Sequence, residues 1–131
     1  FLKKFMKGRK KMKTSKKIIL AEALAPGNTP GNDQLYFLLA RKVQKEKNYG
    51  SYKYQGEWGL LDHLIVSGNL LKPDAPLTTS EAHAGVARLP FLLVPDKRFG
   101  GVQPFRTYIG PRYEGGISDH LPVWAEFRLI Y

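Results

Sequence analysis

Two places in the sequence combine an acid with an imidazole. Ser118, Asp119 and His120 are consecutive, follow a pair of glycines and come directly before an apolar segment. Side chains at the irregular start of a strand can both line a pocket, so Asp119 could bind a metal ion and His120 could act as a general base. Taken alone, such a tripeptide is more typical of an ordinary turn.

The second place is Asp62, which interrupts the apolar run 60–66. A carboxylate in a buried strand is costly unless it is paired or hydrogen-bonded. An imidazole is a suitable partner, because the carboxylate fixes its tautomer and raises its basicity. His120 is the best-placed candidate if the two strands are neighbours; otherwise Asp62 points to solvent at a strand end. His63 is expected on the opposite strand face, and His83 in a polar surface loop.

Hydrophobic spacing predicts the elements that carry these residues. Asn32 or Asp33 caps a helix over 34–45, whose leucines recur at helical spacing, and a shorter helix is predicted over 16–24. Strands are predicted at 52–58, 60–66, 86–94 on either side of Pro90, and 121–130. Residues 72–80 and the long, glycine-rich segment 95–116 are predicted to be loops. Two helices followed by about four strands indicate an α/β (α+β) fold.

The positive charge is concentrated at one end. The chain of 131 residues has a formal charge of +10, but residues 1–17 hold nine of its 21 basic side chains and no acid. The other residues carry 12 basic and 11 acidic side chains. Because like charges repel, we expect the basic segment to be mobile.

With 43% hydrophobic residues, the chain is long enough for one core and too short for two.

Several classes of protein are excluded by the composition. Cysteine is absent, so disulfides, thiolate nucleophiles and Cys-ligated zinc are excluded. No apolar run approaches the roughly 18 residues of a membrane span, and the first residues lack the apolar region of a signal peptide. The sequence also contains no nucleophile elbow, Walker loop, dinucleotide fingerprint or His-Glu-x-x-His helix.

Two stretches together resemble the endonuclease/exonuclease/phosphatase superfamily, and more narrowly its endonuclease-like members in Bacteroides-type bacteria. In 52–71, Leu-Asp-His-Leu-Ile-Val-Ser resembles the superfamily's Leu-Asp-x-hydrophobic-hydrophobic-x-Ser strand. In 116–123, Ser-Asp-His-Leu-Pro-Val resembles the segment that leads into its last strand. The similarity covers about residues 14–131. We expect residues 1–13 to be a basic, disordered segment outside the family domain at 14–131.

The resemblance implies the C-terminal half of a four-layer α/β/β/α sandwich with mostly antiparallel strands. It also implies hydrolysis of a phosphate-ester substrate, nucleic acid among the candidates, with Mg²⁺ or Mn²⁺. By position, His120 would assist attack by water as base or phosphate ligand, and Asp62 would orient and polarise it. Asp119 would lie on the metal and water side, and Trp58 would help to shape the substrate pocket. Many bacterial relatives are exported, which makes export of a parent protein one possibility, but the sequence leaves the compartment unknown.

The sequence departs from the family pattern in its first residues. The family also uses an early Asn, a metal-binding Glu and a Gly-Asp-x-Asn segment, which would fall just before Thr14. Here residues 6–13 are lysine-rich and cannot bind a cation. Because the sequence also begins with Phe1, we expect a piece of a longer protein, with a weak or absent metal site and little activity alone.

A second function remains open from the sequence. The chain could be a non-catalytic module whose basic residues 1–17 bind nucleic acid or an anionic membrane surface by charge.

Overall fold

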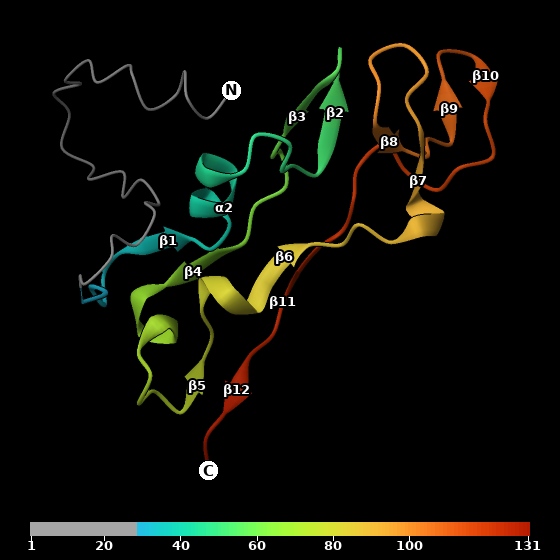
Figure 1. Ribbon diagram of the computed structural model, residues 1–131. Helices are drawn as coiled ribbons and strands as arrows, with labels where there is room; N and C mark the ends of the chain where they lie inside the picture. The colour runs from blue at the N-terminus through green and yellow to red at the C-terminus, as the bar shows by residue number, and fades with distance from the viewer. Residues whose placement is uncertain (1–28) are drawn as a thin grey trace, which may run out of the picture.

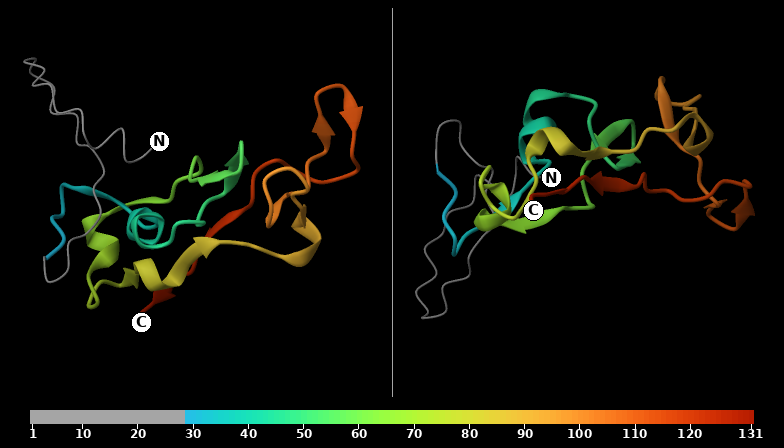
Figure 2. Two further views of the ribbon diagram at one scale, coloured as in Figure 1. Left: turned by 45° about the horizontal axis from the view of Figure 1, so that its top comes forward. Right: turned by 90° about the horizontal axis from the view of Figure 1, so that it is seen from below.

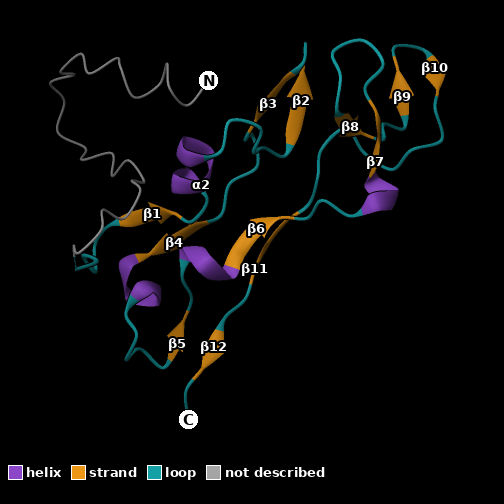
Figure 3. Ribbon diagram, in the orientation of Figure 1, coloured by secondary structure: helices purple, strands orange, loops and turns teal. Residues whose placement is uncertain are grey.

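The computed structural model describes residues 29–131 (Figure 1). The helix predicted over 16–24 and the basic segment 1–17 lie outside this range. The described chain consists mostly of short antiparallel strands with little helix (Figure 3), which is consistent with an α/β or β-rich fold. No helix in this range is long and apolar enough to cross a membrane.

The strands form two-stranded antiparallel pairs. The strands are β1 (Leu35–Phe37), β2 (Tyr52–Tyr54), β3 (Glu57–Gly59), β4 (Ile65–Ser67), β5 (Leu77–Thr78), β6 (Ala84–Val86), β7 (Leu93–Pro95), β8 (Val102–Pro104), β9 (Tyr108–Ile109), β10 (Arg112–Tyr113), β11 (Val123–Ala125) and β12 (Arg128–Leu129). The pairs are β1 with β4, β2 with β3, β5 with β12, β6 with β11, β7 with β8, and β9 with β10. The helical elements are α2 (Ala40–Lys45), η1 (Gly68–Leu71), η2 (Glu81–His83) and η3 (Pro90–Leu92). Figures 1 and 2 show an elongated arrangement, with β7–β10 at one end and β5 and β12 at the other.

The predicted helix over 34–45 is wrong in its first half. Residues Leu35–Phe37 form β1, and only Ala40–Lys45 form α2. Strand β1 pairs with β4, placing Tyr36 opposite Val66, and Tyr36 is buried. A strand partner that is distant in sequence therefore overrides the helical spacing of the leucines, since helix propensity is a weak preference.

The aromatic stretch 52–58 is a hairpin rather than one strand. Gln55 and Gly56 connect β2 to β3, and both have positive φ, 48° and 86°. A two-residue connection of this kind matches the right-handed twist of the flanking strands. A Cβ at Gly56 would lie 3.0 Å from Phe99, so any other residue here would crowd the Phe99 side chain as well as adopt a positive φ.

The strand predicted over 60–66 is displaced and shorter. Strand β4 covers Ile65–Ser67, and Asp62 lies in a bend before it, with 37% of its side chain exposed. The expected pairing of this strand with 121–130 is also wrong, because β4 pairs with β1 and β11 pairs with β6. Asp62 is therefore half-buried in a bend instead of buried in a strand.

The remaining predictions are correct only in part. The strand expected over 86–94 is interrupted, as β6 ends at Val86 and η3 begins at Pro90. The segment 95–116, expected to be a loop, contains β8, β9 and β10. The last strand is divided into β11 and β12.

A small core holds the strand pairs together. Its buried residues are Tyr36, Leu38, Leu39, Leu60, Val66, Ala84, Val86, Leu92 and Leu121. Leu60 and Leu121 lie two residues before Asp62 and one residue after His120, so burial of their side chains anchors both polar residues.

Candidate active site

The structure brings Asp62 and His120 together. His120 Nδ1 lies 2.7 Å from Asp62 Oδ2, although the two residues are 58 positions apart in the chain. The contact expected between these side chains is therefore present, but it does not come from pairing of their two strands. Their side chains are 37% and 35% exposed, so solvent reaches both partners.

Ser51, which the sequence analysis did not single out, connects the two segments. Its backbone oxygen accepts a hydrogen bond from Leu121 N at 2.7 Å, and its hydroxyl donates to Asp62 Oδ2 at 2.6 Å. Tyr52 and His120 are bridge partners in an antiparallel arrangement. The fully buried Ser51 thus aligns the residues before β11 with the start of β2 and holds the carboxylate of Asp62.

Hydrogen bonding outweighs burial at the Asp62 carboxyl. Partial burial alone would raise its pKa, but the hydrogen bonds from Ser51 and His120 lower it, with smaller contributions from the charges of His120 and His63. The net pKa of Asp62 lies below the ordinary value of an aspartate. Asp62 is therefore ionised at neutral pH and accepts hydrogen bonds through Oδ2.

An ionised carboxylate fixes the tautomer of its imidazole partner. When Nδ1 of His120 carries the proton and donates it to Asp62, Nε2 has a lone pair that can accept a proton from another molecule. The orientation of His120 is also supported by its backbone N–H, which donates to Ser118 Oγ at 3.0 Å. Chemically, this arrangement can act as a general base.

Asp119 and Trp58, the other two predicted site residues, are less closely associated with the Asp62–His120 pair. Asp119 is exposed beside His120. Trp58 packs against the core, and the guanidinium carbon of Arg88 lies 4.2 Å from the centre of its ring. In the described part of the chain, no hydrogen bond or ring contact joins Trp58 to Asp62 or His120. The roles given to Asp119 and Trp58 stay predictions.

The metal site expected around Asp119 has no further set of ligands among the described residues. Among residues 29–131, no group of three or more His, Asp or Glu side chains is arranged to hold a metal ion. The donor set expected for Mg²⁺ or Mn²⁺, several oxygen ligands, is therefore not assembled by the described residues.

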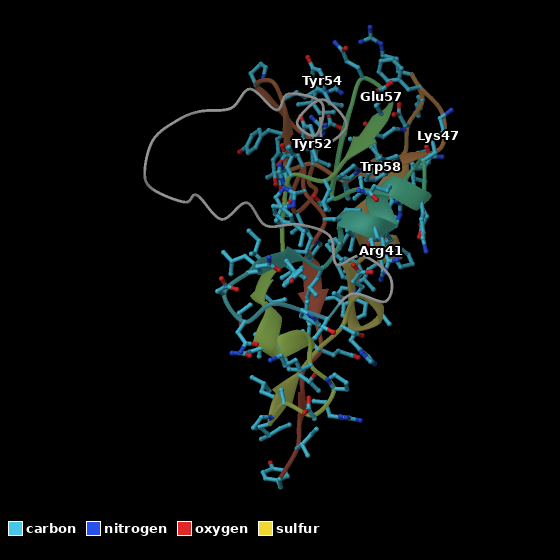
Figure 4. All side chains as sticks on the ribbon, turned by 90° about the vertical axis from the view of Figure 1, so that its left-hand side faces the viewer. Arg41, Lys47, Tyr52, Tyr54, Glu57 and Trp58 are labelled. Atoms are coloured by element: carbon cyan, nitrogen blue, oxygen red, sulfur yellow. The ribbon has the colours of Figure 1, made fainter. Side chains whose placement is uncertain are left out.

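Tyr52 and Arg106 extend the site on one side. The ring centres of Tyr52 and His120 are 5.0 Å apart, and the guanidinium carbon of Arg106 lies 5.5 Å from the Tyr52 ring centre. Figure 4 shows Tyr52 and Tyr54 close together on the hairpin, with Trp58 on the side nearer to α2. The sequence contained a signal for this cluster in the alternating aromatics, but not its position beside His120.

A carboxylate that holds an imidazole in one tautomer recurs in hydrolytic enzymes. The family model described as "Endonuclease/Exonuclease/phosphatase family" matches residues 12–129, and the chain belongs to this family. Its members generally hydrolyse phosphate esters and generally depend on a divalent metal. No curated protein and no solved structure gives a significant match.

Proposed function

We propose that this chain carries the Asp–His part of a divalent-metal-dependent phosphoesterase that hydrolyses phosphodiester or phosphomonoester bonds. The observation that supports it is the 2.7 Å contact between Asp62 Oδ2 and His120 Nδ1, both partly exposed, in a chain of this family.

In this proposal His120 acts on the attacking water. Nε2 takes a proton as the water oxygen forms its bond to phosphorus, and the bond from phosphorus to the leaving oxygen breaks. Asp62 holds the imidazole in the required tautomer and stabilises the imidazolium that forms. Ser51 keeps the carboxylate oxygen in place through its 2.6 Å hydrogen bond. General-base assistance of this kind contributes roughly 10²–10⁴-fold to the rate.

The finer assignments belong to the same proposal. Asp119, exposed next to His120, lies on the metal and water side, and Trp58 contributes to the pocket wall. The metal would be Mg²⁺ or Mn²⁺, with Asp119 as one ligand, and its further ligands would have to come from outside residues 29–131, where no group of three or more His, Asp or Glu side chains is arranged to hold a metal ion. We infer that the polypeptide alone has little or no activity, because the family's Gly-Asp-x-Asn segment would fall where residues 6–13 are lysine-rich. The domain at 14–131 corresponds to the C-terminal half of a four-layer α/β/β/α sandwich of the Bacteroides endonuclease-like type.

Hydrolysis of an activated phosphodiester by the intact gene product tests the proposal. We expect turnover of bis(p-nitrophenyl) phosphate with Mg²⁺ or Mn²⁺, and a fall in kcat of about 100-fold or more for His120→Ala. His83→Ala is the matched control, because His83 is exposed and bonded to Ser80 outside the site. Absence of turnover with either metal, or equal loss in both variants, would overturn the proposal.

A further inference from the structure

A basic cleft lies between the tip of the β2–β3 hairpin and the β7–β10 end of the molecule. It has a volume of about 680 Å³ and is lined by the turn at 54–56, the segment 94–99, and residues from β8 to β10. Figure 1 shows the β2–β3 hairpin next to β7 and β8, on the side of the molecule away from β5 and β12. The mechanism proposed above uses none of the residues in this cleft.

The cleft carries positive charge that its own acids do not neutralise. Lys53 pairs with Asp96, and Arg112 pairs with Glu114. No further acid lies among the lining residues. The lining does include three further cations, which are Lys97, Arg98 and Arg106. Such an excess favours a ligand with more than one negative charge.

The walls of the cleft are held in place by a buried ion pair. Lys53 Nζ lies 2.7 Å from Asp96 Oδ2, and both side chains are only 5% exposed. Lys53 Nζ also donates to Gly100 O at 2.8 Å, and Asp96 Oδ1 accepts from Phe99 N at 2.9 Å. The hairpin and the segment 96–100 are therefore fixed relative to each other before any ligand binds, which lowers the entropy cost of binding.

An exposed aromatic ring stands at the edge of the cleft. Tyr54 is 61% exposed, and its ring is stacked on that of Tyr52 with an interplanar angle of 13°. One face of the ring is therefore supported by Tyr52. Every nucleic-acid base has a flat face that stacks on an aromatic ring, whereas a simple phosphate or a sugar phosphate has none.

Arg106 connects the cleft to His120. It lines the cleft, its guanidinium lies over Tyr52, and Tyr52 lies against the His120 imidazole. Arg106 Nε is buried and has no hydrogen-bond partner among the described residues, while Nη2 donates to Lys53 O at 2.8 Å. As a cation that lines the cleft, Arg106 can pair with a phosphate on the side of the cleft nearer to His120.

From this combination of cations that no lining acid neutralises, an exposed stacked tyrosine and contact with the His120 side, we propose that the cleft binds single-stranded nucleic acid beside the reacting phosphate. Phosphates of the strand lie at Lys97, Arg98 and Arg106, and a base stacks on Tyr54. The inference rests on the proposed phosphoesterase function and specifies its substrate class.

Binding of fluorescein-labelled oligo(dT), measured by anisotropy with the full chain in EDTA, tests the cleft. We expect the salt dependence of log Kd to become shallower by about 1.4 in Lys97→Gln/Arg98→Gln, since each lost phosphate contact removes roughly 0.7 for single strands. The matched control is Lys45→Gln/Lys47→Gln, which removes the same charge from exposed positions in and after α2. Both variants keep the basic residues 1–17, so any binding by that segment is equal in the two.

Stacking is tested with an abasic strand of the same length. We expect the chain to prefer oligo(dT) over the abasic strand, and Tyr54→Leu to weaken oligo(dT) binding by about fivefold or more. Tyr113→Leu is the control, because Tyr113 is also exposed but does not line the cleft. Equal effects of the cleft and control variants, or equal affinity for the two strands, would overturn the inference.

The binding readout is independent of turnover. If cleft and control variants bind alike while His120→Ala still abolishes hydrolysis, the cleft inference fails and the proposed phosphoesterase stands. If the cleft variants lose binding while His120→Ala leaves hydrolysis unchanged, the proposed role of the Asp–His pair fails. A duplex that contains the oligo(dT) strand tests the choice of a single strand. If the wild type binds the duplex more tightly than oligo(dT), and Lys97→Gln/Arg98→Gln removes that preference, the ligand of the cleft is a duplex and the inference of a single strand is overturned.

Discussion

The hydroxyl of Ser51 makes two hydrogen bonds to Asp62, one as donor and one as acceptor. Ser51 Oγ donates to Asp62 Oδ2 at 2.6 Å and accepts from Asp62 N at 3.4 Å. Because Ser51 is fully buried and also holds Leu121 through its backbone oxygen, one serine determines where the carboxylate meets His120. The relationship makes Ser51 a positioning residue for the pair.

Removal of this hydroxyl should raise the pKa of Asp62. In Ser51→Ala the ionised carboxylate loses a hydrogen bond that stabilises it, whereas burial, which raises the pKa, remains. Carboxyl ¹³C NMR titration measures the pKa, and Ser80→Ala is the control. A pKa of Asp62 that is unchanged or lower in Ser51→Ala contradicts the account. Because the pair is partly exposed, we expect a loss of only about 1 kcal/mol in the free energy of unfolding.

Asp62→Asn should test whether the carboxylate positions and stabilises the His120 imidazole during the reaction. The amide keeps the shape of the side chain but does not require the Nδ1–H tautomer of His120, and it cannot stabilise an imidazolium. For the longer protein of the proposed function we expect kcat to fall by about 100-fold or more, with a smaller change in KM. Asp74→Asn, at an exposed position away from the pair, is the control. A rise in KM at unchanged kcat would show that Asp62 acts in binding only.

Stability should fall in acid because two aspartates have lowered pKa values in the folded chain. The hydrogen bond from Lys53 is the main cause for Asp96, followed by that from Phe99 N, and Asp62 is lowered by Ser51 and His120 despite its burial. A carboxyl with a depressed folded pKa stabilises the fold above its unfolded pKa of about 3.9. That contribution is lost as the pH falls through the lower folded values. Thermal melts between neutral pH and pH 2 check this.

Lys53→Met isolates the Asp96 part of the acid effect. It leaves a buried carboxylate without its cation, so the melting temperature at neutral pH should fall by several degrees. The acid dependence should also become weaker, because the pKa of Asp96 is no longer lowered by Lys53. Lys97→Met, at an exposed neighbouring position, should do neither. Equal melting temperatures for the two variants would contradict the structural role of the ion pair.

Gly56→Ala should destabilise the β2–β3 hairpin. Gly56 has φ of 86°, and an added Cβ would lie 3.0 Å from Phe99. The left-handed backbone alone costs an alanine about 1–2 kcal/mol, so urea unfolding should show at least this loss. Gly59→Ala is the matched control, because a Cβ there meets nothing within 4 Å. A loss in Gly59→Ala as large as in Gly56→Ala would remove the turn as the cause.

Local spacing predicted the elements unevenly. The leucines of 34–45 have helical periodicity, yet Tyr36 is buried against Val66 in a strand pair because that burial outweighs a small preference for helix. The turn at Gln55 and Gly56 was not predicted, because aromatic residues alternate with polar ones on both strands of the hairpin and the stretch therefore resembles one continuous strand. By contrast, the break at Pro90 was predictable, since proline cannot donate to a strand ladder.

The sequence by itself determined the chemistry that is available: the residue types at positions 62 and 120, the surrounding family pattern, and the apolar neighbours that anchor them. The tertiary structure decided how they meet. Two residues 58 positions apart come within 2.7 Å because Ser51 binds the segments of both, and not because their strands pair. Backbone hydrogen bonds between segments distant in sequence depend on which apolar surfaces are buried together, and local periodicity carries no record of that choice.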